Sequence, residues 1–320
     1  MNLNDSRAGT ALSRRMPFPV ICLIFSGLYF TSALHLPGQA SQETAVVKSV
    51  HTVVDMTPDE LLTYYSAEIR GLEFGPDQEE LGSLLGKMGE RVEAFFQNFA
   101  NTSSKEQVLL ERLRADGSRD ASSKQEYNYL ILVHPGKTGI EIQEDRVDDR
   151  GRPIGEKRTS GFMASSGFAG LSILLHPRHH YGSRFRYLGT QLTDPPAKVI
   201  AFAQKMEVGD YLAGISDLDF GMIPLLLQGI VWVNPDTCQI VRIRTDLLMP
   251  ETRIALMRQT TDVRFVEVRF DKVPEPFWLP GEVTVTWAIK GTTYRSRHIY
   301  SGYKLFTIES YDKIELPKPK

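Results

Sequence analysis

The sequence predicts a mainly β fold of the α+β class. In it, a large curved antiparallel sheet, an incomplete β-barrel of about ten or eleven strands, packs on N-terminal and mid-chain helices. Apolar residues recur at every second position through most of residues 105–313, and clusters of Gly, Pro, Asp and Asn separate these stretches. Helical periodicity is confined to residues 58–104 and a stretch near 165–175. Because short turns join consecutive strands, the sheet is expected to be antiparallel.

The first forty residues have the pattern of a secretory signal peptide. Arg14 and Arg15 precede the apolar stretch PFPVICLIFSGLYF, and small residues mark a cleavage site after Ala40. Since residues 17–36 are about long enough to cross a bilayer, retention as an uncleaved anchor is the alternative. Cleavage predicts an exported protein, most simply periplasmic, whose mature form is not transmembrane.

Net charge and cysteine content indicate what kind of partner and which compartment the protein has. Loss of residues 1–40 removes three Arg and one Asp, which moves the net charge from −2 to −4. A mildly acidic protein offers no broad electrostatic footprint for nucleic acid. Cys238 is then the only cysteine, so no internal disulfide can form. An exported protein without disulfides favours a bacterial periplasm.

Residues 41–57 are expected to be a mobile lead-in to a single domain over residues 58–320. Thr57 and Pro58 begin a first helix, because a hydroxyl N-cap and a proline at the first position are helix-start signals; Gly71 ends it. A second helix is predicted from about residue 78 to 99. Its apolar residues recur at spacings of three and four, which places on one face Leu81, Leu84, Leu85, Met88, Val92, Phe95, Phe96 and Phe99.

The remaining elements are strands, apart from one more helix near residues 165–175. The predicted strands cover residues 106–114, 125–133, 139–147, 183–192, 197–205, 229–234, 238–248, 262–273, 281–290, 293–301 and 303–314. Residues 207–227 have no clear period and are predicted to be irregular, with room for a short helix. In GEVTVTWAIK, Val283, Val285 and Trp287 alternate with polar residues, so this strand has one wet face.

This order of elements resembles a known fold. A signal peptide, an amphipathic helix and a long antiparallel meander are followed by GIVWVNPDTCQIVRI (229–243), which resembles the periplasmic lipoprotein-localisation-factor (LolA-like) fold, also used by related sigma-factor regulatory proteins. The block FWLPGEVTVTWAIKGTTYRSRHIYSGYKLF (277–306) is similar to uncharacterised exported proteins of soil bacteria. The resemblance implies an apolar concavity that holds acyl chains beneath a helical lid. No ligand-contacting motif matches, so no residue role is carried over.

The leading hypothesis is therefore a non-enzymatic exported protein that binds an apolar ligand, a lipid or a lipoprotein acyl chain, without a cofactor, a metal or catalytic residues. The residues expected to line its cavity are Phe95, Phe96, Phe99, Trp232, Phe265, Val283, Val285 and Trp287. Rim residues are expected to be His179, His180, Phe277 and Trp278. His298, between Arg295 and Arg297, is expected on a basic outer or edge face.

Two alternatives remain. HPRHH (176–180) holds three of the seven histidines, which raises the possibility of a metal-dependent hydrolase. Pro177 disfavours a shared helical turn, so the preferred interpretation is a helix-to-strand junction. The other alternative is a cell-envelope interaction or sensor module with a protein partner, a packed core and no ligand.

Overall fold

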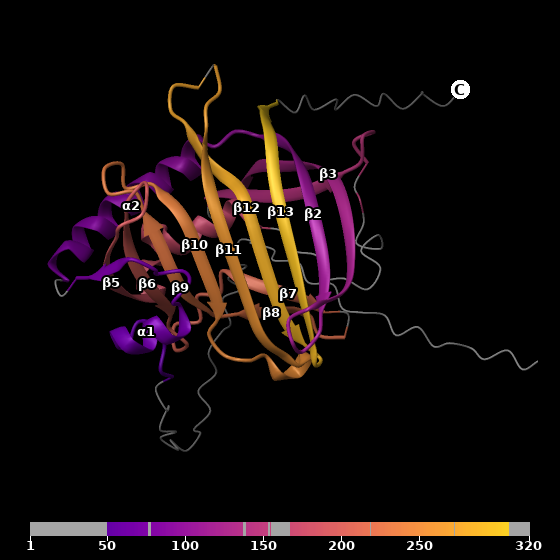
Figure 1. Ribbon diagram of the computed structural model, residues 1–320. Helices are drawn as coiled ribbons and strands as arrows, with labels where there is room; N and C mark the ends of the chain where they lie inside the picture. The colour runs from indigo at the N-terminus through magenta and orange to yellow at the C-terminus, as the bar shows by residue number, and fades with distance from the viewer. Residues whose placement is uncertain are drawn as a thin grey trace, which may run out of the picture.

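The computed structural model describes residues 50–75, 78–136, 139–152, 154, 167–217, 219–271 and 273–306. The predicted signal peptide, the first part of the lead-in and the chain after residue 306 lie outside the described residues. Within them, the fold is mainly β and is built on one large antiparallel sheet, as the sequence predicts (Figure 1).

The large sheet has eleven strands in the order β1-β5-β6-β9-β10-β11-β12-β13-β2-β3-β4. Its end strands β1 and β4 are not paired with each other, so the sheet is an open half-barrel. The strands are β1 (Leu72–Phe74), β2 (Thr102–Leu113), β3 (Arg119–Gly136), β4 (Gly139–Val147), β5 (Ser183–Gln191), β6 (Ala197–Gln204), β9 (Leu227–Val233), β10 (Ile240–Leu247), β11 (Leu256–Val268), β12 (Phe277–Ile289) and β13 (Thr292–Leu305).

Two predictions about strands are wrong. Residues 207–227 hold a two-stranded antiparallel sheet, β7 (Ala213–Asp217) and β8 (Gly221–Leu225). Each strand has only five residues, too few for a period of two to stand out in the sequence. The strand predicted over residues 293–301 continues into residues 303–305 as one strand, β13, with a bulge at Gly302, whose φ is 64°. The rest of the strand predicted over residues 303–314 lies outside the described residues from residue 307 on.

The helices of the described residues are α1 (Pro58–Tyr64), α2 (Glu79–Asn98) and the short 3-10 helices η2 (Ala169–Leu175), η3 (Pro177–Gly182) and η4 (Thr252–Ile254). Thr57 caps α1 and Pro58 is its first residue, as expected, and Glu60 completes a capping box with Thr57; the helix ends at Tyr64, before Gly71. The mid-chain helix is of the 3-10 type and stops at His176, because Pro177 cannot continue it.

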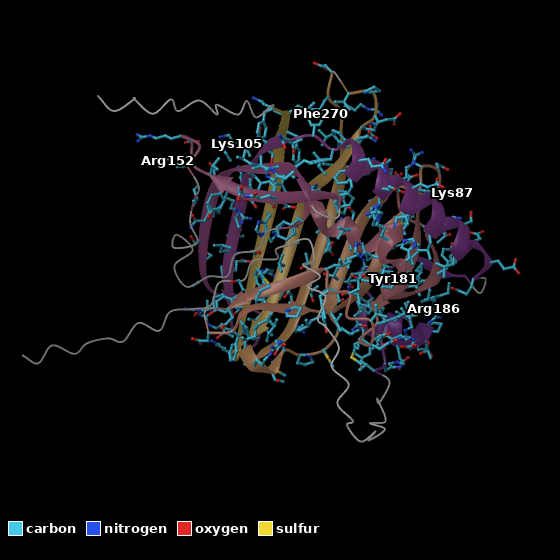
Figure 2. All side chains as sticks on the ribbon, turned by 180° about the vertical axis from the view of Figure 1, so that it is seen from behind. Lys87, Lys105, Arg152, Tyr181, Arg186 and Phe270 are labelled. Carbon is cyan, nitrogen blue, oxygen red and sulfur yellow. The ribbon has the colours of Figure 1, made fainter. Side chains whose placement is uncertain are left out.

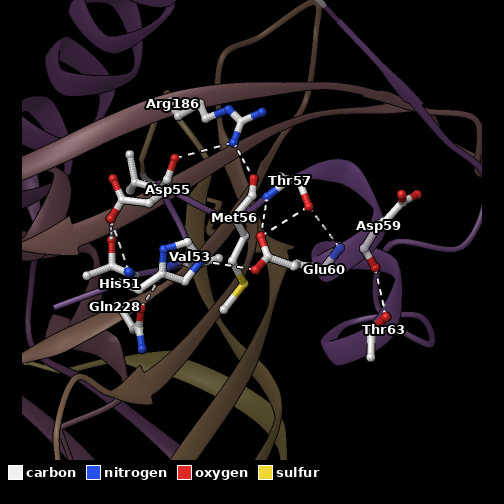
Figure 3. Close-up of polar contacts among 12 residues, drawn as sticks. His51, Val53, Asp55, Met56, Thr57, Asp59, Glu60, Thr63, Arg186 and Gln228 are labelled. Carbon is white, nitrogen blue, oxygen red and sulfur yellow. Dashed lines mark hydrogen bonds and ion pairs between the residues drawn. The ribbon is translucent and has the colours of Figure 1, made fainter.

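Both faces of the sheet bury apolar residues, in separate clusters. The concave face carries the larger core, which is covered by α2, η2 and the β7–β8 sheet. The outer face of β5, β6, β9 and β10 carries a second core beneath α1. Hydrogen bonds join the segment before α1 to this face of the sheet: Val53 N donates to Gln228 Oε1 on β9 (2.8 Å), and Arg186 Nη1 on β5 donates to Met56 O (2.5 Å) (Figure 3).

Candidate ligand-binding concavity

The concave face brings together most of the predicted cavity residues. Val283, Val285 and Trp287 alternate inward along β12 and are fully buried, as the pattern of GEVTVTWAIK predicts. Phe265 on β11 and the apolar face of α2, which includes Phe96, belong to the same core cluster. Phe95, Phe99, Phe277 and Trp278 pack against or within this cluster as well.

The prediction that Trp232 lines the concavity is wrong. It lies on the outer face, in the core beneath α1, where its Nε1 donates to Gln191 Oε1 (2.5 Å) and the Arg242 guanidinium lies 4.2 Å from its ring. Its neighbours Val231 and Val233 face the concavity instead. Because β9 is buried on both faces, its sequence is apolar throughout and does not reveal which residues face inward.

An aromatic mouth lies where the C-terminal end of α2 meets the connection between β11 and β12. We define it as Phe95, Phe99, Phe270, Phe277 and Trp278. The ring of Phe277 is 6.3 Å from Phe95, 5.3 Å from Phe99 and 5.8 Å from Phe270. Figure 2 shows Phe270 on the connecting loop beyond the end of the sheet, close to α2. Phe277 is buried rather than on the rim, whereas Phe95, Phe270 and Trp278 are half-buried.

A small pocket opens beside this mouth, with a volume of about 30 Å³. That volume holds one or two water molecules. The residues that line it are Arg91, Val92, Phe95, Ser172, Gln239, Ile240, Phe265 and Trp278. The pocket is therefore a small hollow at the edge of a filled concavity, and exposed Arg91 is the cation that lines it.

Residues 167–175, here named the plug segment, fill the middle of the concavity. Leu171, Leu174 and Leu175 are buried in the main core. The start of the segment is held by the carboxylate of Glu144, which accepts hydrogen bonds from four consecutive N–H groups, those of residues 167–170, at 2.8, 2.9, 2.8 and 3.2 Å. Burial raises the pKa of Glu144 to about 7, against the opposing effect of these donors.

The three histidines of HPRHH make separate contacts. His176 caps η3, with Nδ1 accepting from Arg178 N (3.2 Å); His179 Nδ1 pairs with Asp210 Oδ2 (2.9 Å); and His180 Nε2 meets Leu175 O (2.8 Å). Among the described residues, no three His, Cys, Asp or Glu side chains gather as a metal site. The predicted rim residues His179 and His180 lie on η3, which packs against α2, and not at the aromatic mouth.

His298 is placed differently from the sequence-based interpretation. It is 1% exposed on the concave face, because β13 is an interior strand between β12 and β2, with Arg295 and Arg297 alternating outward. Its Nδ1 contacts Glu106 Oε1 (2.8 Å) and its Nε2 contacts Ser296 Oγ (2.8 Å). Arg295 and Arg297, two positions apart, indicate the solvent-exposed face of the strand. Since His298 alternates with them, this pattern predicts that His298 faces the core.

Glu106 is the centre of a buried ionic cluster that sequence reasoning missed. Arg146 donates to its two oxygens from Nε (2.5 Å) and Nη2 (2.7 Å), and Tyr300 OH donates to Oε1 (2.8 Å). Burial alone would raise the pKa of Glu106, but Arg146 and the hydrogen bond from His298 lower it to about 2. β2, β4 and β13 supply these residues, and they meet only because the three strands lie close together in the sheet.

No protein-family model and no curated protein sequence matches this chain. Solved structures with a similar arrangement include a putative outer membrane lipoprotein-sorting protein domain from Vibrio parahaemolyticus, with 11% identity, a TM-score of 0.35, and coverage of 71% of this chain and 94% of that one. A DUF1329 family protein from Desulfovibrio piger has 11% identity and a TM-score of 0.35, covering 75% and 96%. A LolA superfamily protein from Nitrosomonas europaea has 13% identity and a TM-score of 0.28, covering 71% and 94%.

These neighbours are of the kind that the sequence resemblance indicates. Among the described residues, no helix is both long enough and apolar enough to cross a membrane.

Proposed function

We propose that this is an exported, periplasmic protein that binds the acyl chain of a lipid or lipoprotein in the concavity of its half-barrel. The observation that carries the proposal is the aromatic mouth, where half-buried Phe95 and Trp278 line a small pocket beside the largest apolar core of the described chain. Apolar concave sites with a few polar groups at the rim are typical of small-molecule binding.

Binding a whole chain requires the concavity to open, because the pocket of about 30 Å³ is too small. The elements that fill it, α2 and the plug segment, contact the sheet mainly through side chains and not through strand pairing. Each buried methylene contributes about 0.8 kcal/mol, so about ten of them would contribute about 8 kcal/mol towards separating these elements. The leucines of the plug segment occupy the space that the chain would take.

Arg91 supplies a cation beside the entrance. Its Nε donates to Thr237 O (3.2 Å), and its side chain lies exposed at the edge of the pocket. A carboxylate or phosphate headgroup can pair with a guanidinium at this position while the chain enters the mouth. The expected ligand is therefore an anionic amphiphile.

The proposal is tested by measuring uptake of a fluorescent fatty acid and of phosphatidylglycerol by the mature protein. Saturable binding of one chain is expected, and Phe95→Ser should weaken it at least about tenfold through lost apolar contact. Phe220→Ser, at an exposed phenylalanine in the β7–β8 turn, is the matched control and should bind as the wild type does. No uptake, or equal loss in both variants, would contradict the proposal.

A second candidate function is an envelope interaction module with a packed core. The observation that favours it is the filled concavity, in which the described chain's own residues take up the ligand's place. Native mass spectrometry of protein isolated from the periplasm separates the two candidates: an apo mass that persists after lipids are offered supports the interaction module.

A further inference from the structure

Three polar side chains stand in line in the apolar concavity: Ser296, His298 and Glu106. We propose that they form a nucleophilic relay and that the protein cleaves acyl esters whose chain enters the concavity. The acyl part of this substrate class rests on the proposed function above, whereas the reactivity of Ser296 rests on the geometry alone.

The position of each hydrogen in the relay follows from the contacts. Glu106 is paired with Arg146 through both oxygens, so it is an ionised acceptor. His298 must then donate to it from Nδ1, which leaves a lone pair on Nε2 of the neutral ring. Ser296 Oγ, 2.8 Å from that nitrogen, must donate its proton. This is the resting arrangement of a serine nucleophile with its general base.

The electrostatic setting suits proton transfer from Ser296. Burial lowers the pKa of His298 below its usual value of 6.5, in spite of Glu106, so the ring is neutral and ready to accept a proton at pH 7. Once His298 is protonated, the Glu106 carboxylate stabilises the imidazolium at 2.8 Å. Glu106 is thus a positioning residue, fixed in turn by Arg146 and by Tyr300.

Two unsatisfied polar groups lie on the same face as Ser296, on the next two strands of the sheet, β12 and β11. Val285 pairs directly with Ser296 across β12 and β13, and Thr261 pairs with Val285 from β11. Trp287 is two residues further along β12, on the same face. Trp287 Nε1 and Thr261 Oγ1 are buried and find no hydrogen-bond partner among the described residues. Native proteins rarely leave buried donors unpaired, so a ligand oxygen is a fitting partner.

The plug segment closes this site. Ser296 is fully buried, and the ring of Phe168 lies 5.1 Å from that of His298. A chain that displaces the segment would bring its ester to Ser296, whereas without substrate the segment keeps water away from the nucleophile. The relay and the acyl concavity therefore share one covering element, the segment held by Glu144.

The reaction balances with water as co-reactant. Ser296 Oγ bonds to the ester carbonyl carbon while its proton passes to His298 Nε2. The carbon–oxygen bond to the alcohol breaks, and the alcohol leaves with that proton. Water then attacks the acyl-serine, giving one proton to His298, which returns it to Ser296 Oγ as the carboxylic acid is released.

The test is reaction of the mature protein with a long-chain alkyl fluorophosphonate, followed by peptide mass spectrometry. The proposal expects one alkylphosphonyl adduct, on Ser296, with loss of fluoride. Ser296→Ala should abolish it, and His298→Gln should slow it about 10²-fold or more. Ser183→Ala, at another buried serine, should leave it unchanged. Because the pKa of His298 is lowered, labelling should persist below pH 6.5.

The outcomes separate this inference from the proposed function. A protein that binds lipid but forms no adduct on Ser296 overturns the relay and leaves acyl binding standing. An adduct on Ser296 in a protein that retains no lipid supports the relay alone. Mapping the adduct in the wild type keeps the test valid if Ser296→Ala fails to fold.

Discussion

Glu144→Gln removes the buried carboxylate that holds the plug segment, and its effect can be worked out from the structure. Burial raises the pKa of Glu144 from 4.5 to about 7. Between these values the folded protein keeps a proton that the unfolded chain has lost, so the free energy of unfolding falls as pH rises from about 4.5 to 7. At about 1.4 kcal/mol per pKa unit, the charged group costs about 3 kcal/mol above pH 7.

The glutamine cannot ionise, so this part of the pH dependence should disappear. Urea unfolding of both proteins between pH 5 and 8 measures it: relative to the variant, the wild type should lose up to about 3 kcal/mol on going to higher pH. Glu126→Gln, at an exposed residue of β3, serves as the control and should track the wild type. A wild type that gains stability relative to the variant as pH rises would refute the reasoning, because the four N–H donors would then outweigh burial.

Two further substitutions test the packing around the site. Arg146→Met leaves the buried Glu106 carboxylate without its cation and should lower the free energy of unfolding by about 3–5 kcal/mol. The double variant Glu106→Gln/Arg146→Met should recover much of that loss. Equal loss in the single and double variants would contradict the account of a buried ion pair. Gly89→Ala places a Cβ 2.8 Å from Pro177 Cγ and should cost about 1–3 kcal/mol in thermal unfolding. A Cβ added at Gly86 meets nothing within 4 Å, so Gly86→Ala should instead stabilise α2 by up to about 1 kcal/mol. Similar effects of the two substitutions on stability would contradict the close packing of η3 on α2.

The strands and α2 could be predicted from the sequence because each has an uninterrupted period of adequate length. The period of three and four in α2 and the alternation in β12 place their inward residues correctly. Asn-Pro at 234–235 and Lys-Gly at 290–291 are turn-forming sequences between strands, and the structure has a turn at each: Asn234 Oδ1 accepts from two backbone N–H groups, and Lys290 and Gly291 have positive φ.

The candidate site was only partly predictable, because it depends on pairings far apart in the sequence. Glu106 and His298 are 192 positions apart, and nothing in either local stretch indicates the other. Trp232 was misplaced because its strand is buried on both faces. The plug segment was expected as a helix, but its hydrogen bonding to Glu144 is a tertiary contact that no local pattern encodes.

Quenching of Trp278 by a brominated fatty acid tests acyl binding at the aromatic mouth most directly. In Trp232→Phe/Trp287→Phe, Trp278 is the remaining tryptophan, and it lines the entrance pocket. In Trp278→Phe/Trp287→Phe the remaining tryptophan is Trp232, buried on the opposite face beneath α1. Saturable quenching of Trp278, with Trp232 unaffected, is the predicted result. Unchanged Trp278 fluorescence in the presence of saturating fatty acid, or equal quenching of both tryptophans, would contradict binding at the aromatic mouth.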